Sequence, residues 1–220
     1  MFIGHFAAGL GAKAIQPKVS LGTLFIASQF IDLLWPFLLQ LGVERVHIDP
    51  GNTTVTPLDF AHYPISHSLV TTVGWGLLLG IIYRILRSDT RGAILVGLLV
   101  VSHWFLDLIV HRPDLPLYPG DAPLMGFGLW NSLTGTLIIE GLLFVGGIYL
   151  YIRTTIPKNK QGRFGFWGLI GFLCIVYAGN LTGPPPPNES ILAWVGHLQW
   201  LIVAWGYWVD HSRQVKTRSF

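Results

Sequence analysis

The chain has 220 residues, of which 51% are hydrophobic and only 11% are charged, and its formal net charge is +3. Soluble globular domains carry about a quarter charged residues, so this composition excludes an ordinary soluble domain and predicts a membrane protein. No basic stripe interleaved with aromatic residues occurs, so we expect no nucleic-acid partner, and the single cysteine, Cys174, excludes both a disulfide framework and a cysteine-based zinc site.

Six apolar blocks have about the 20 residues that a membrane helix needs. They cover residues 19–42, 64–86, 92–110, 127–152, 164–181 and 191–209. A shorter block, 2–15, is rich in glycine and alanine, and we expect it to form a short membrane helix packed closely against the next span. No basic region precedes its apolar part, so we do not expect a cleaved signal peptide. The predicted fold class is an all-α, polytopic transmembrane helix bundle that forms one integral membrane domain over residues 1–220.

The lysines and arginines lie almost entirely in one set of connections between these blocks. This set holds Lys13, Lys18, Arg84, Arg87, Arg91, Arg153, Lys158, Lys160, Arg163, Arg213, Lys216 and Arg218. The opposite connections hold only Arg45 and Arg112. Because cytoplasmic loops carry an excess of Lys and Arg, we expect a multi-pass protein of the inner membrane with its C-terminus in the cytoplasm.

Ionisable side chains are costly at membrane depth and usually mark a site. With this orientation, Asp32, His67, His103 and Asp107 fall in the outer half of the membrane or at its edge. His5 reaches the same depth if the short first block also crosses, with Met1 outward and Lys13 inward. His103 and Asp107 are four residues apart, so they share one helix face and can offer two ligands to one metal ion. Imidazole and carboxylate groups bind zinc and similar divalent ions. The sequence therefore predicts a metal site within residues 1–125, with three further spans in residues 126–220.

Three further residues are candidates with open alternatives. His62 precedes His67 by five residues across Pro64, so it would have to reach the site from a loop. His111 lies one further turn beyond Asp107, and a ligand role and a structural role are equally supported. Glu140 stands in the middle of the fourth block and is either a general base or a partner for a neighbouring polar group.

Several short motifs occur in a fixed order over about the first 120 residues. They are Gly4-His5, Ile31-Asp32, His62-Tyr63-Pro64-Ile65-Ser66-His67-Ser68, Ser102-His103-Trp104-Phe105-Leu106-Asp107 and Pro116-Leu117-Tyr118-Pro119. This series resembles the bacterial and archaeal inner-membrane proteins known as membrane-bound metal-dependent hydrolases. Phe30 stands where that pattern has an earlier aspartate, and Tyr63-Pro64 replaces Arg-Gly, which removes a potential second-metal ligand and a potential phosphate partner.

The resemblance implies hydrolysis without naming a substrate. The leading hypothesis is a hydrolase in which His5, Asp32, His62, His67, His103, Asp107 and His111 are the candidate ligands of a zinc-like ion. Such an ion lowers the pKa of bound water toward 7, and Asp32 and Glu140 are the candidate catalytic bases. The depth of the site favours a lipid-borne ester or phosphoester as substrate. The alternatives are an ion- or proton-coupled transporter that uses the same cluster and a scaffold whose helices are stabilised by metal.

Overall fold

The computed structural model describes residues 1–216, so Arg218 of the basic set lies outside the described residues. About 64% of the chain is helical. The helices are α1 (Ile3–Ala12), α2 (Leu21–Ser28), α3 (Phe30–Gln40), α4 (Leu69–Arg87), α5 (Thr90–Val110), α6 (Leu133–Thr154), α7 (Lys160–Thr182), α8 (Glu189–Gly196) and α9 (Gln199–His211). Three short antiparallel ribbons join them, namely β1 (Arg45–Ile48) with β2 (Leu58–His62), β3 (Leu115–Pro116) with β4 (Leu124–Met125), and β5 (Thr155–Pro157) with β6 (Arg213–Val215).

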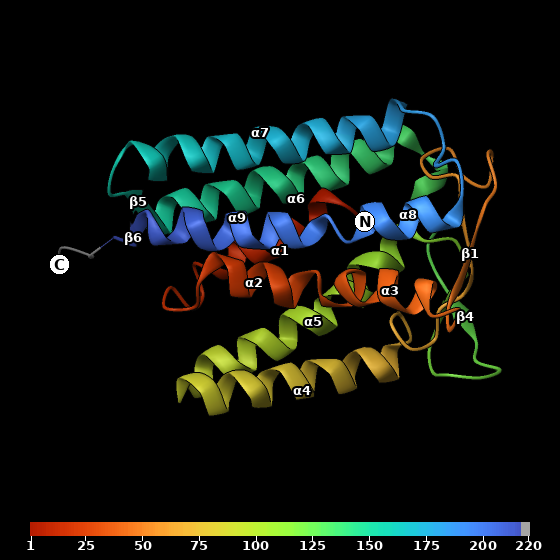
Figure 1. Cartoon of the computed structure of the whole chain (residues 1–220), viewed down its shortest axis with the longest axis horizontal. Coiled ribbons are helices and arrows are strands. Elements are labelled where there is room, and N and C mark those ends of the chain that lie inside the picture. The colour runs from red at the N-terminus through yellow and green to blue at the C-terminus, as the bar shows by residue number, and fades with distance from the viewer. Residues whose placement is uncertain (217–220) are drawn as a thin grey trace.

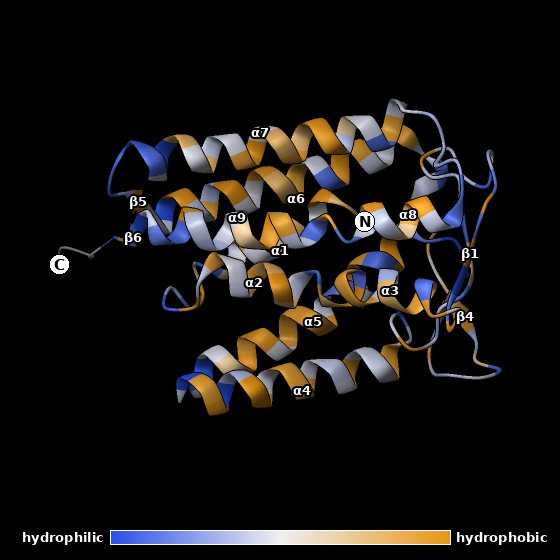
Figure 2. Ribbon diagram, in the orientation of Figure 1, coloured by the Kyte–Doolittle hydropathy of each residue, from blue (hydrophilic) through white to orange (hydrophobic). Residues whose placement is uncertain are grey.

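Within the described residues, α4, α5, α6 and α7 are the four helices that are each long and apolar enough to cross a membrane. Their apolar residues run along the middle of the molecule, and hydrophilic residues gather at its two ends (Figure 2). The mostly helical fold that the sequence predicts is therefore confirmed, with four to five candidate membrane-spanning helices. The predicted number of six spans is not confirmed. The block at 19–42 is divided into α2 and α3, and the block at 191–209 is divided into α8 and α9.

The helices α2 and α3 form a bent pair, with 56° between their axes, that would count as a fifth crossing if it is one broken span. The bend stands at Gln29, where no proline or glycine signals it in the sequence. Further along α3, Pro36 has no amide hydrogen to donate to the carbonyl of Asp32 four residues earlier. The backbone is thus irregular on both sides of Asp32.

The short helix α1 packs between α2 and α6, as glycine and alanine allow. A methyl group on Gly147 of α6 would lie 2.5 Å from the carbonyl oxygen of Ala7, so the two backbones are in direct contact. On the other side, a methyl group on Gly9 would lie 2.8 Å from the ring of Phe25 in α2. The expected close packing against the next span is present, and α6 is a second partner that the sequence did not indicate.

The connections that carry most basic residues lie together at one end of the molecule, at the α1–α2 and α4–α5 turns and the β5–β6 ribbon (Figure 1). Two of these basic side chains are buried. Lys13 lies 2.7 Å from the carboxylate of Asp210 and donates to the carbonyl of Val19. Arg213 stacks over the rings of Tyr151 and Phe166. These two charges stabilise helix packing as well as contributing to the charge asymmetry.

Candidate metal centre

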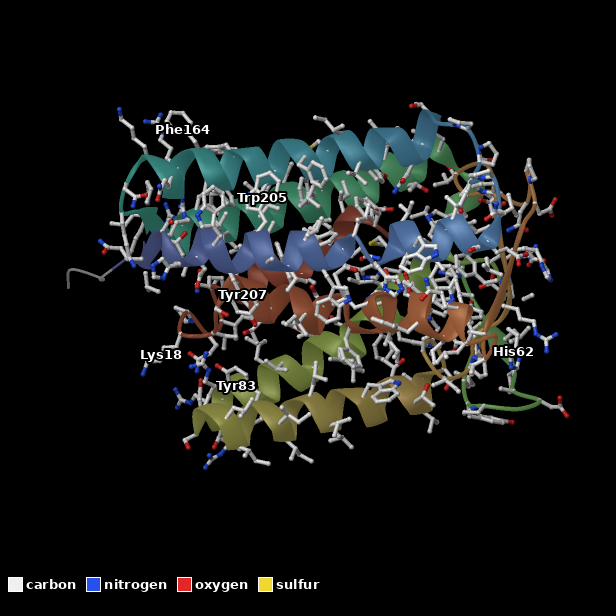
Figure 3. The ribbon with its side chains drawn as sticks, viewed as in Figure 1. Lys18, His62, Tyr83, Phe164, Trp205 and Tyr207 are labelled. Carbon is white, nitrogen blue, oxygen red and sulfur yellow. The ribbon has the colours of Figure 1, made fainter. Side chains whose placement is uncertain are left out.

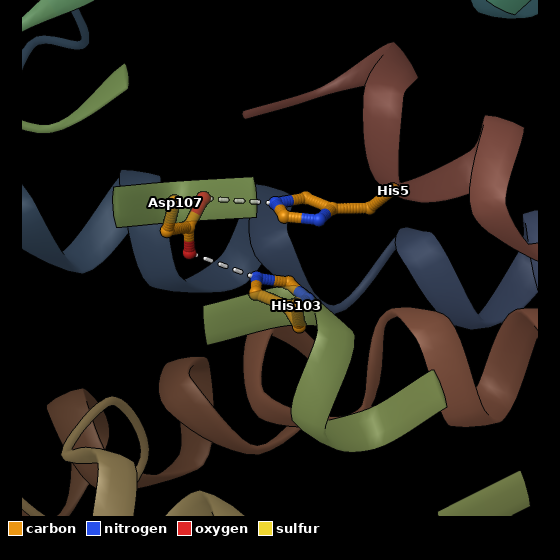
Figure 4. A group of neighbouring side chains, drawn as sticks. All are labelled: His5, His103 and Asp107. Atoms are coloured by element: carbon orange, nitrogen blue, oxygen red, sulfur yellow. Dashed lines mark hydrogen bonds and ion pairs between the residues drawn. The ribbon is translucent and has the colours of Figure 1, made fainter. Parts of the chain in front are cut away.

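Two groups of three metal-binding side chains share His103. One group is His5, His103 and Asp107, and the other is Asp32, His67 and His103. Within each group, the ligand atoms lie within 4.8 Å of one another. The first group joins α1 to α5, as Figure 4 shows. Four of these side chains are at most 3% exposed, whereas Asp32 is 27% exposed and is the most accessible member of the two groups.

The break between α2 and α3 fixes the position of the hydrogen on Nδ1 of His103. Its Nδ1 lies 2.8 Å from the carbonyl oxygen of Ser28, the last residue of α2. A carbonyl oxygen can only accept, so Nδ1 carries the hydrogen, and in the neutral ring Nε2 carries a lone pair. That Nε2 is buried without a hydrogen-bond partner, 3.1 Å from Asp107 Oδ2 and 3.5 Å from Asp32 Oδ2.

His67 is oriented in the same way through a serine and a glutamate. Ser66 Oγ lies 2.6 Å from His67 Nδ1 and donates its hydrogen to Glu44 Oε2 at 2.6 Å. Because a hydroxyl has one hydrogen, Ser66 must accept from His67, so Nδ1 is protonated. The lone pair of a neutral His67 therefore lies on Nε2, which is 3.3 Å from Asp32 Oδ1 and 3.9 Å from Asp107 Oδ2.

Asp107 joins the two groups. Its Oδ1 accepts from His5 Nε2 at 2.9 Å and lies 2.6 Å from the amino group of Met1, while its Oδ2 faces His103. The rings of His5 and His103 are stacked, with centroids 3.4 Å apart and planes inclined by 13°. Such close stacking disfavours a positive charge on both rings at once, because like charges repel.

These residues fit a divalent metal ion. In the neutral rings two Nε2 lone pairs face carboxylate oxygens, and this repulsion is relieved either by a proton on Nε2 or by a cation held between the groups. A tetrahedral ion with ligand distances of about 2.0 to 2.2 Å separates its ligands by roughly 3.3 to 3.6 Å. The separations from His103 Nε2 and His67 Nε2 to the two carboxylates are 3.1 to 3.9 Å. Asp32, His67 and His103, with Asp107 beside them, are therefore the best-placed ligand set.

Three predicted site residues lie outside both groups. His62 is exposed at the end of β2 (Figure 3). His111 makes its hydrogen bond, at 2.9 Å, to Asp114. Glu140 accepts backbone hydrogens from Phe2 at 3.0 Å and Gly4 at 3.3 Å, so it anchors the start of the helix that carries His5. The structure thus brings together five of the predicted residues and gives these three other surroundings.

A second polar cluster lies beside the centre, where α5 ends. The hydroxyl of Tyr63 donates to Asp114 at 2.9 Å, and the ring of Tyr63 lies 5.1 Å from that of His67. Burial, followed by the Asp114 carboxylate, raises the pKa of Tyr63 well above its usual value. Burial also lowers the pKa of His111. Both groups are therefore held neutral at physiological pH, and of the two Tyr63 packs directly beside His67.

Sequence reasoning did not identify the residues that orient the ligands. Glu44, Ser66 and the carbonyl of Ser28 set the hydrogen positions on His67 and His103. Glu44 is 22 residues from Ser66, and Ser28 is 75 residues from His103, so no local spacing could reveal either contact. Of these three residues, only Ser66 lies within one of the sequence motifs, directly before His67.

No family model, no curated protein and no solved structure matches this chain.

Proposed function

We propose that this protein is a metal-dependent hydrolase embedded in the inner membrane. The observation that carries the proposal is the orientation of two buried imidazoles. His67 and His103 each have Nδ1 committed as a donor, and each directs Nε2 toward the carboxylates of Asp32 and Asp107. Partners that fix a histidine in this way are typical of metal sites.

Asp32, His67, His103 and Asp107 would hold the ion, and His5 would support Asp107 through its hydrogen bond at 2.9 Å. The donor set of nitrogen and carboxylate oxygen suits zinc. When bound, such an ion supplies Lewis acidity and a more acidic water molecule at neutral pH.

Asp32 and Glu140, the two candidate bases, have different roles in this proposal. Asp32 is the partly exposed member of the group, so it can meet a substrate and accept a proton. Glu140 is occupied by backbone amides of α1, which favours a positioning role over that of a general base. Burial of the centre between helices favours a substrate that arrives from the bilayer, such as a lipid-borne ester or phosphoester.

The proposal includes a finer topology. We infer six crossings, with α2–α3 and α8–α9 each counting as one, plus the short helix α1. The basic end of the molecule would face the cytoplasm. The centre would then open toward the opposite side, at the end of the molecule that holds β1 and β2 (Figure 1).

The motif series supports membership of the membrane-bound metal-dependent hydrolases. His5, Asp32, His67, His103 and Asp107 come from four motifs between residues 4 and 107, and they lie in two overlapping groups. His62 belongs to the same series but is exposed. Phe30 packs against Trp75, with ring centroids 5.7 Å apart, so no carboxylate stands at that position to hold a second metal ion.

A transporter is the second candidate, and one observation favours it. Lys13 and Asp210 form a buried ion pair at the other end of α1, within reach of the hydroxyl of Tyr151. Ionisable groups therefore occur at both ends of α1, as a path across the membrane requires. The two functions differ in which residues they need, because Asp210 has no part in the hydrolase site.

Metal analysis of the purified protein tests the proposal. We expect a transition metal to copurify with the wild type and with His47→Ala, whose side chain is 58% exposed. His67→Ala and His103→Ala should lose the metal and also lose hydrolysis of a panel of lipid esters and phosphoesters. The absence of metal, together with unchanged thermal stability in chelator, would refute the metal centre. The transporter would replace the hydrolase as the proposed function if two results were obtained together. The protein would bind metal without hydrolysing any substrate, and it would conduct ions in proteoliposomes in a way that Asp210→Asn abolishes.

A further inference from the structure

A polar cavity of 630 Å³ lies at the basic end of the molecule, far from the metal centre along α4 and α5. The cationic residues that line it are Lys18, Arg87 and Arg91. The rest of the lining is polar or aromatic: Gln16, Ser20, Thr23, Tyr83, Ser88 and Asp89. Lys18 and Tyr83 lie near each other at this end of the molecule, on the α1–α2 connection and near the end of α4 (Figure 3).

The charge of the cavity is positive and unbalanced. Asp89 is its only acid, and that carboxylate already accepts from the amide of Gly92 and from Gln16 Nε2. Over residues 1–216, no ion pair involves Lys18, Arg87 or Arg91. All three side chains are exposed. The cavity therefore offers three cationic side chains against one carboxylate, together with hydroxyl donors, which suits an anion with several oxygen atoms.

The end of α4 beside the cavity also carries exposed apolar side chains. Ile81, Ile85 and Leu86 precede Arg87 on that helix and are 58%, 73% and 73% exposed. Since α4 is long and apolar enough to span the membrane, these side chains face lipid chains. The cationic residues stand at the end of the span, at the depth of the headgroups. Basic pockets between membrane helices at this depth bind anionic lipid headgroups.

We propose that this cavity binds the phosphate of an anionic phospholipid, whose acyl chains lie along the exposed face of α4. Lys18, Arg87 and Arg91 pair with the phosphate, and the hydroxyls of Tyr83 and Ser88 are placed to donate to the headgroup. The lipid joins the α1–α2 connection to the α4–α5 turn, so it also stabilises their arrangement. This inference does not depend on the metal centre or on hydrolysis.

The test compares lipid binding in three forms of the full chain. The first is the wild type and the second is Lys18→Gln/Arg87→Gln/Arg91→Gln. The third is Arg153→Gln/Lys160→Gln/Arg163→Gln, which removes the same charge from exposed positions at the same end but outside the cavity. Each is purified, and retained phosphatidylglycerol is counted by native mass spectrometry. Melting temperatures are measured in nanodiscs of phosphatidylcholine with and without phosphatidylglycerol, and in detergent with inorganic phosphate.

We expect the wild type and the outside variant to retain phosphatidylglycerol and to melt at a higher temperature when it is present. The cavity variant should bind it at least roughly tenfold more weakly, because each cation near an anionic lipid contributes about a fivefold factor. Equal binding by all three forms would overturn the proposal. So would an equal loss in both variants, which would indicate diffuse charge, or an equal stabilisation by inorganic phosphate, which would indicate a site for a soluble anion.

Discussion

A single hydrogen decides whether His67 can act as a ligand. Glu44 Oε1 accepts from the amides of Ile65 and Ser66 at 2.8 Å, and its Oε2 accepts from the Ser66 hydroxyl. This leaves Ser66 only as an acceptor toward His67. Glu44 does not contact the candidate ligands, but through Ser66 it leaves Nε2 of a neutral His67 with a lone pair for a metal ion. Glu44 is a positioning residue whose effect passes through Ser66.

Replacement of Glu44 by glutamine should reverse this arrangement. With the glutamine oxygen held by the two backbone amides, its NH₂ faces Ser66, so the serine must donate to His67 Nδ1. The hydrogen of His67 then moves to Nε2 and blocks it as a ligand. We expect Glu44→Gln to weaken metal affinity by roughly 10- to 100-fold, measured by competition with a chromogenic chelator.

The matched control is Glu189→Gln. Glu189 lines the same surface cavity as Glu44, but it is 55% exposed and pairs with His47. Its substitution should leave metal affinity unchanged. If Glu44→Gln bound metal as tightly as the wild type at an unchanged melting temperature, the proposed control of the His67 hydrogen would be wrong.

At the scale of elements, the centre depends on irregular helices. Because α2 ends at Ser28, its last carbonyl groups have no helical partner, and one of them accepts from His103. The continuous apolar block at residues 19–42 predicted the presence of a membrane segment here but gave no sign of the bend. Bends of this kind arise from tertiary packing, which hydropathy does not encode.

The close contact of α1 with α6 gives a test of how helix packing supports the centre. A methyl group on Gly147 would lie 2.5 Å from the carbonyl oxygen of Ala7, so Gly147→Ala must push α1 away. Overpacking of this kind costs about 1 to 3 kcal/mol. Because α1 carries His5, both the melting temperature and the metal affinity should fall.

The adjacent glycine is the control for this experiment. A methyl group on Gly146 would meet nothing within 4 Å. Gly146→Ala should therefore keep the wild-type melting temperature or raise it slightly, since alanine favours the helix. Equal behaviour of the two variants would mean that the backbone contact between α1 and α6 does not limit stability.

At the scale of the whole molecule, patterns within a single segment were predictable and contacts between segments were not. Long apolar blocks identified α4 to α7, and the four-residue spacing of His103 and Asp107 placed both on one face of α5. Depth grouped His5, Asp32 and His67 with them. Depth could not separate these from His111, because it does not specify the direction in which a side chain points. It set His62 in a loop and Glu140 in the middle of its span but did not reveal their partners.

The charge asymmetry makes a prediction about the orientation of the whole protein. Asp121 is exposed in the β3–β4 connection and Lys160 is exposed at the first residue of α7, at opposite ends of the bundle. Cys174 lies on an exposed face within α7. In a Cys174→Ala background, a membrane-impermeant maleimide added to spheroplasts should label Asp121→Cys. Lys160→Cys should be labelled only after permeabilisation, because basic connections remain in the cytoplasm.

The protein that retains only Cys174 is the control, and it should resist the reagent in both conditions because lipid covers that face of α7. If Lys160→Cys alone were labelled from outside, the protein would have the opposite orientation in the membrane. The metal centre would then open toward the cytoplasm. Labelling of both positions from outside would require an even number of crossings between residues 121 and 160. Since α6 is the only helix between them that is long enough to span the membrane in the described structure, that result would remove α6 from the set of spans.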